Sequence, residues 1–371
     1  MKRHVFLIPG FFGFANLGDF TYWGPAEHKL RALLNEAGMP ASIHAVKSLP
    51  TASLRTRTRC LLETIARARP GGDAIIHLVG HSTGGLDARL LLTPTVKLHS
   101  RIDVEGIARQ VRSSTSVATP HLGAPIASFF TGLLGRKLLK LLSVLTMLGL
   151  RGGELPLSLW ARVAGIFAVP AAVGGNLAEQ LYLQLLADFS PERREQVRAL
   201  LQEVERDQAL LTQLTVESMD LFNAAAGDRD GVRYGSVVTG ARQPGLSTSI
   251  EIGLDPVDQA QHALYYSLSR LAGGYDFPPP ARQYRRALKK ALGQIPDSTT
   301  NDGIVPTLSQ LWGECIAVAR ADHLDIIGHY QDDDDEQHQY DWLTTHSDFR
   351  SGNFQAVWQR VVAFMAAAEA T

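Results

Sequence analysis

Cysteine is scarce in this chain of 371 residues, which has only Cys60 and Cys315. Two cysteines give neither a disulfide framework nor the spacing of a structural metal site, so we expect both to be reduced core thiols, with one bridge between them as the alternative. An excess of charge is also lacking, because the formal net charge is −1. Without a global basic field, nucleic acid is not an expected partner.

Long apolar runs are missing as well. The most apolar stretch, residues 138–150, is interrupted by Lys140, Ser143, Thr146 and Gly149, and is too short to span a membrane. Near the N-terminus the apolar run 5–8 is too short for a signal peptide and lacks a small-residue cleavage site. We therefore expect the mature protein to begin near Met1 and to be cytoplasmic, with secretion by a signal-independent route as the alternative.

Strand-like and helix-like patterns alternate in the first third of the chain. Apolar runs at 5–8, 74–79 and 111–118 read as strands, and residues 26–37 and 54–69 read as helices. This alternation predicts the α/β class: a mostly parallel central sheet with helices on both faces. The arginines of 54–69 are predicted to form a solvated helix face; they are Arg55, Arg57, Arg59, Arg67 and Arg69.

The alternation stops near Pro125, and residues 126–231 show no convincing strand pattern. We predict a helical lid or cap insertion there, between a first core half at 1–125 and a second at 232–371. The second half contains another helical insertion at about 255–292, and the runs 304–306 and 315–319 are expected to bracket the last sheet elements.

Ser82 lies at the centre of Gly80-His81-Ser82-Thr83-Gly84, directly after the apolar run 74–79 and before a helix-like segment. A strand, a G-x-S-x-G turn and a helix in this order form the nucleophile elbow of α/β-hydrolases. The turn is so tight that side chains at the glycine positions would clash. The pattern therefore predicts Ser82 as a nucleophile.

A serine hydroxyl needs a base and an acid that orients the base. In α/β-hydrolases the acid and then the histidine follow the serine along the chain. Asp302, on a predicted turn, and His323, just after the run 315–319, fit this order. Asp297 competes for the role of the acid, and His329 and His346 compete for that of the base.

Two backbone N–H groups are needed to bind the oxyanion of the tetrahedral intermediate. One is predicted at Thr83, the residue after the nucleophile, and the other in the loop after the first strand, where we choose Phe11.

Together these motifs resemble bacterial triacylglycerol lipases of the Pseudomonas type. The segments that carry the resemblance are residues 10–16 with Tyr22-Trp23, 80–85, 119–125, Leu214-Thr215 with Phe222-Asn223, 301–303 and 323–325. One departure is Pro9, where the family usually has a histidine. The resemblance implies an α/β-hydrolase fold and a serine-dependent ester hydrolase acting on lipids.

The resemblance also implies a structural Ca²⁺. The family holds it with an aspartate two residues after the catalytic histidine, matched by Asp325, and one from an Asp-Pro-x-Asp segment, matched by Asp255. Two carboxylates with carbonyls and water suit this hard cation. His329 replaces the glutamine expected six residues after the histidine.

Substrate class depends on the apolar stretch 138–150, which something must cover. It is either a buried core helix or a lid over an acyl pocket that opens at a lipid surface. Its place after the strand nearest the elbow favours the lid, and hence a lipase for medium- to long-chain esters with transient contact to membranes. The alternatives are a short-chain carboxylesterase, a polyester hydrolase and a non-catalytic lipid-binding protein of the same fold.

Overall fold

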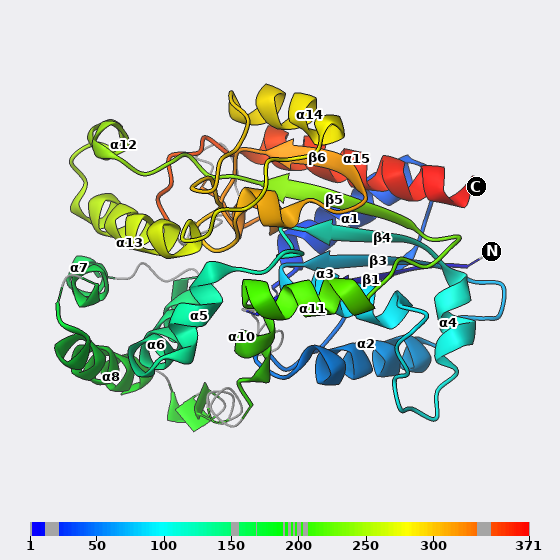
Figure 1. Ribbon diagram of the computed structural model, residues 1–371, viewed down its shortest axis with the longest axis horizontal. Helices are drawn as coiled ribbons and strands as arrows, with labels where there is room; N and C mark the ends of the chain where they lie inside the picture. The colour runs from blue at the N-terminus through cyan, green and yellow to red at the C-terminus, as the bar shows by residue number, and fades with distance from the viewer. Residues whose placement is uncertain are drawn as a thin grey trace.

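The computed structural model describes residues 2–11, 22–149, 156–167, 169–187, 207–331 and 343–370, with isolated positions between 190 and 202. Its centre is one sheet in the order β2-β1-β3-β4-β5-β6, in which every neighbouring pair is parallel (Figure 1). The strands are β1 (Arg3–Ile8), β2 (Ser42–Ala45), β3 (Ile75–His81), β4 (Val111–Val117), β5 (Arg233–Thr239) and β6 (Glu314–Ala319). The predicted α/β class is confirmed.

Both faces of the sheet are covered because successive side chains of a strand point to opposite sides. In β1, Val5 and Leu7 join a core that includes α1 (Gly24–Glu36) and α15 (Ser351–Glu369). Phe6 and Ile8 join a second core on the other side. That second core includes α2 (Leu54–Ala68), α3 (Thr83–Leu92) and α4 (Val104–Gln110).

The solvated face predicted for the arginines of α2 is wrong at one position. Arg55, Arg59, Arg67 and Arg69 are exposed, but Arg57 is completely buried. A buried guanidinium requires hydrogen-bond acceptors around it. The periodicity of α2 places Arg57 on the same face as Leu54 and Leu61, which points into the core.

The segment between β4 and β5, where a helical insertion is predicted, is helical in its described parts. It contains α5 (Pro125–Thr131), α6 (Leu133–Gly149), α7 (Leu157–Ile166), α8 (Ala171–Ala187), α10 (Ala209–Gln213) and α11 (Val216–Ala225). Helices α5 to α8 gather at the carboxyl end of the strands, on the left in Figure 1. Leu138, Leu139, Leu141, Leu142, Val144 and Leu145 of α6 are all buried.

The second insertion follows β5 and consists of α12 (Leu246–Glu251), α13 (Pro256–Ala272) and α14 (Arg282–Leu292). Helix α13 packs beside α7 (Figure 1). Residues 304–306, expected to bracket the last sheet elements, form no strand there: Pro306 makes an isolated bridge to Asn301 before a short 3-10 turn, η1 (Thr307–Gln310). No helix among the described residues is both long and apolar enough to cross a bilayer.

An ion-pair cluster closes the amino end of the sheet. Arg3 Nη2 donates to Glu369 Oε2 at 2.6 Å, and His77 Nε2 donates to Glu369 Oε1 at 3.0 Å. The hydrogen bond from Arg3 lowers the pKa of Glu369 to about 2, from an ordinary value of 4.5. This cluster ties α15 to β1 and β3.

Glu369 should make the fold sensitive to acid. Because its pKa is lower in the folded state, its ionised form stabilises the fold above about pH 4.5, and that contribution is lost as the pH falls towards 2. Glu369→Gln should therefore lower the free energy of unfolding in urea at pH 7, with a difference from wild type that shrinks at pH 3. Glu36→Gln, at the exposed end of α1, is the matched control. A difference of constant size at both pH values would contradict the assignment.

Candidate active site

Ser82 lies on the sharp turn between β3 and α3, with a left-handed φ of 54° and ψ of −129°. The two flanking glycines are required by close backbone approach. A Cβ on Gly80 would lie 2.3 Å from the carbonyl carbon of Gly84, and a Cβ on Gly84 would lie 2.2 Å from the carbonyl oxygen of Ile8. The turn predicted from the G-x-S-x-G pattern is therefore present, and it holds Ser82 in a strained conformation at the carboxyl edge of the sheet.

Asp302 and His323 meet at the same edge. His323 Nδ1 lies 2.9 Å from Asp302 Oδ2, and the backbone N–H of His323 donates to the Asp302 carbonyl at 3.0 Å. Both side chains are buried. A carboxylate at Nδ1 fixes the imidazole with its proton on that nitrogen, so Nε2 can act as a base.

Four further donors hold the Asp302 carboxylate in place. Oδ1 accepts from the backbone N–H groups of Ile304 and Val305, at 3.1 and 2.7 Å. Oδ2 accepts from Thr239 Oγ1 at 2.7 Å and Gln310 Nε2 at 3.3 Å, in addition to the imidazole. These bonds fix the plane of the carboxylate.

A narrow cavity of about 40 Å³ joins the nucleophile and the base, because both Ser82 and His323 line it. Apart from these two and Thr83, every lining residue is apolar. The apolar lining consists of Phe11, Pro120, Ala124, Ile126, Ala127, Phe130, Leu139, Leu211, Leu214, Ile304 and Val305. The site is therefore a mostly apolar pocket under the helical insertion, with Ser82 and His323 at one wall.

The three competing residues lie elsewhere. Asp297 binds the backbone and hydroxyls of Thr299 and Thr300 in its own turn. His329 donates from Nε2 to the carbonyl of Tyr22, and His346 lies 3.6 Å from Glu251. None of them lines the cavity.

The predicted oxyanion donors, Phe11 and Thr83, both line the cavity beside Ser82. Thr83 is the first residue of α3, where backbone N–H groups have no acceptor within the helix. The preceding loop residue, Gly10, uses its N–H to donate to the Tyr22 hydroxyl at 3.2 Å. Residues 12–21, the rest of the loop named in the resemblance, lie outside the described residues.

Sequence reasoning missed the buried polar groups that support this site. Arg57 donates from Nη2 to Asp87 Oδ2 at 2.8 Å and to the carbonyl of Pro9 at 2.7 Å. Burial raises the pKa of Asp87 to about 6, and the neighbouring Arg57 opposes that shift. The helical position of Arg57 among apolar residues was the available signal.

Breaking the ion pair between Arg57 and Asp87 should lower the free energy of unfolding. Arg57→Ala leaves a buried carboxylate without its partner, and such losses cost about 3–5 kcal/mol. We expect a large fall in the free energy of unfolding, together with lower activity, because the Pro9 carbonyl borders the oxyanion loop. Arg59→Ala, on the exposed face of the same helix, should stay within about 0.5 kcal/mol of wild type. Equal stability of the two variants would contradict the buried-pair assignment.

Residues 54–238 match the family described as "Putative serine esterase (DUF676)". The matched region contains the elbow with Ser82 and ends at β5. The chain is a serine hydrolase. No curated protein matches the hydrolase in sequence.

Solved structures show the same α/β-hydrolase fold. EstA from Clostridium botulinum superposes with a TM-score of 0.54 at 16% identity, covering 98% of this chain and 87% of its own. Lipase 1 from Pelosinus fermentans gives 0.53 at 17%, covering 97% and 98%, and Staphylococcus hyicus lipase gives 0.51 at 15%, covering 100% and 97%. The hydrolase thus resembles bacterial lipases and esterases broadly, without singling out the Pseudomonas type.

The two aspartates of the implied calcium site have other contacts in the structure. Asp255 caps α13, where its Oδ1 accepts from Val257 and Asp258, whereas Asp325 Oδ2 accepts from the backbone of Asp322. The described residues contain no group of three or more acidic, histidine or cysteine side chains that could hold a metal ion. Calcium binding stays a prediction of the resemblance, tested by the melting temperature of the hydrolase before and after EDTA and on adding Ca²⁺ back.

Proposed function

We propose that the hydrolase is a lipase that cleaves carboxylic esters with apolar, medium- to long-chain acyl groups. The cavity carries this proposal: a wall of apolar side chains begins directly at Ser82. An acyl chain bound there would be desolvated, at about 0.8 kcal/mol per buried methylene. A polar acyl group would find few hydrogen-bond partners on that wall.

The chemistry follows from the roles that the geometry allows. Ser82 Oγ attacks the ester carbonyl, and His323 Nε2 takes its proton and passes it to the leaving alcohol. Asp302 orients the imidazole and stabilises its charged form. The backbone N–H groups of Phe11 and Thr83 bind the oxyanion. Water, activated by His323, then releases the fatty acid from the Ser82 ester.

The helical insertion supports a role for the cap as a lid. Leu139 of α6 lines the cavity, and the apolar side chains of residues 138–145 are buried, which supports this role. A volume of about 40 Å³ holds only a few water molecules. A long acyl chain therefore requires α6 to move, as expected of a lid that opens at a lipid surface.

A chain-length profile tests the substrate class. With p-nitrophenyl esters from acetyl to palmitoyl, we expect kcat/KM to rise with acyl length to a maximum at medium or long chains. A maximum at acetyl or butyryl would instead indicate a short-chain carboxylesterase. Release of soluble oligomers from a polyester film, without activity on lipids, would indicate a polyester hydrolase.

Transient contact with a lipid surface is part of the same proposal. Several apolar side chains of the insertion are exposed, including Leu133, Val173 and Leu183. Such residues can insert into the headgroup region of a bilayer. Co-sedimentation with liposomes tests this contact, and loss of binding is expected when Val173 and Leu183 are both changed to serine.

A further inference from the structure

The residue before the nucleophile, His81, is completely buried and binds two different loops. Its Nε2 lies 2.8 Å from the carbonyl oxygen of His323, and its Nδ1 is hydrogen-bonded to the Tyr22 hydroxyl. Tyr22 in turn accepts from the N–H of Gly10 at 3.2 Å. One imidazole thus contacts the loop of the base and, through one phenol, the loop of the oxyanion donor.

The chemistry of these groups allows only one arrangement of protons for a neutral His81. A carbonyl only accepts, so Nε2 of His81 must carry the proton that it shares with His323. Nδ1 is then an acceptor, and the Tyr22 hydroxyl must donate to it. The phenol oxygen is left to accept from Gly10, whose N–H only donates. Every group in the chain has a partner, and all hydrogen bonds run in one direction.

We propose that His81 is a positioning residue that aligns the oxyanion loop and the base with the nucleophile. This proposal rests on the proposed function. The hydrogen-bond chain runs from Gly10 through Tyr22 and His81 to the carbonyl of His323. Gly10 precedes the oxyanion donor Phe11, and His81 precedes Ser82. The oxyanion donor and the nucleophile therefore each directly follow a member of this hydrogen-bond chain, and the base, His323, is itself a member.

Because they are buried, the members of this hydrogen-bond chain cannot replace a lost partner with water. Tyr22 is 1% exposed and His81 0%, so an unpaired member has no water to bind. Burial, with His323 nearby, lowers the pKa of His81 far below its ordinary value, and burial also raises that of Tyr22. His329, a third histidine near His81, is neutral as well because burial lowers its pKa to about 4. The proton arrangement therefore persists across the neutral range.

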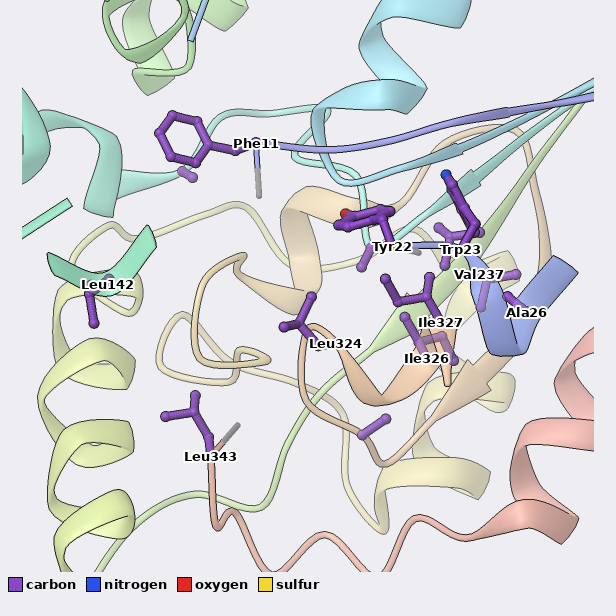
Figure 2. Close-up of a cluster of buried hydrophobic side chains, with 14 of the residues drawn as sticks. Phe11, Tyr22, Trp23, Ala26, Leu142, Val237, Leu324, Ile326, Ile327 and Leu343 are labelled. Carbon is purple, nitrogen blue, oxygen red and sulfur yellow. The ribbon is translucent and has the colours of Figure 1, made fainter. Parts of the chain in front are cut away.

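Packing holds the same groups together. The His81 and His323 rings lie 4.7 Å apart between centroids, and Trp23 meets the His81 ring edge-on at 6.1 Å. Figure 2 shows Tyr22 and Trp23 beside Ile326 and Ile327, from the loop that carries the base. A shift of His81 would thus be transmitted to both loops, and a displacement of about 1 Å at the reacting groups can cost about 100-fold in rate.

Two substitutions separate the two hydrogen bonds. In His81→Gln the amide nitrogen takes the place of Nε2 and keeps the bond to His323, whereas in His81→Asn the amide oxygen takes the place of Nδ1 and keeps the bond to Tyr22. Tyr22→Phe removes only the hydroxyl. We expect each variant to lower kcat by about 10- to 100-fold with little change in KM.

His77→Gln is the matched control. His77 lies on the same face of the same strand, is also 0% exposed and also makes two side-chain hydrogen bonds, to Ser113 and Glu369. It should lower the melting temperature as the His81 variants do, but keep wild-type kcat per folded molecule. A His81 role confined to stability predicts the same unchanged kcat for His81→Gln and His81→Asn, and that result would overturn the proposal.

A double-mutant cycle tests the chain itself. The losses of Tyr22→Phe and His81→Gln should not multiply in the double variant, because both break the same link. Losses in kcat that multiply would show that the two residues act independently, and would refute the hydrogen-bond chain.

Labelling by a fluorophosphonate keeps this test separate from the proposed function. If wild type is not labelled, Ser82 is not the nucleophile. If the His81 variants are labelled at the wild-type rate, only the positioning role is refuted.

Discussion

Changing Ser82 to alanine is expected to lower kcat by about a million-fold, the loss typical of removing the nucleophile of a serine hydrolase. The variant should fold normally, because alanine fits the same turn and the Ser82 side chain makes no capping hydrogen bond to α3. Hydrolysis of p-nitrophenyl esters and labelling by a fluorophosphonate measure the effect. Activity within tenfold of wild type would refute the assignment of Ser82.

Two further variants make the Ser82 result specific. Ser113→Ala removes another buried serine, one that binds His77 far from the cavity, and should keep wild-type kcat. Ser82→Gly should be as inactive as Ser82→Ala but more stable, because glycine tolerates a positive φ and strain at such positions costs about 1–3 kcal/mol. A glycine variant with a lower melting temperature than the alanine variant would argue against stored strain.

The second large effect is expected for Asp302→Asn, which should lower kcat by about 10⁴-fold. If the amide nitrogen of the Asp302→Asn side chain faces His323, its N–H donates, and Nδ1 of the imidazole must accept. The imidazole proton then moves to Nε2, which can no longer act as a base. Turning the amide over does not help, because its nitrogen would then face the backbone N–H groups of Ile304 and Val305. Neither orientation satisfies all donors.

The same conflict should destabilise the fold. A buried donor left without an acceptor costs about 1–3 kcal/mol, so urea unfolding of Asp302→Asn should show lower stability as well as lower activity. Asp297→Asn is the control, because that carboxylate serves only its own turn. If Asp297→Asn lost as much activity as Asp302→Asn, the choice of the acid would be wrong.

Elements with a strong local signal were predicted from the sequence. The apolar runs of β1, β3 and β4 and the amphipathic pattern of α2 lie within two residues of the observed bounds. The edge strand β2 was missed because Ser42–Ala45 has no buried residue and pairs only with β1. Its existence depends on tertiary contacts that local sequence does not encode.

The catalytic roles of Ser82, Asp302 and His323 stay a prediction, but these residues could be chosen from the sequence, since a nucleophile, an acid and a base have a fixed order and fixed turns. The groups that hold them in place could not be chosen in this way. Arg57 was predicted to lie on a solvated helix face, and the G-x-S-x-G pattern leaves the residue at position 81 open. What distinguishes them is complete burial beside specific acceptors, which appears only once distant segments are brought together.

The apolar lining of the cavity comes partly from the insertion and partly from the core, which supplies Phe11, Ile304 and Val305. Ser82, Asp302 and His323 belong to the sheet edge, whereas Phe130 and Leu139 belong to the insertion. Exchanging Leu139 for a smaller or larger residue would therefore change which acyl groups fit the cavity and leave Ser82, Asp302 and His323 in place. Substitutions in the insertion alone would thus give enzymes with the same catalytic residues and different acyl specificities.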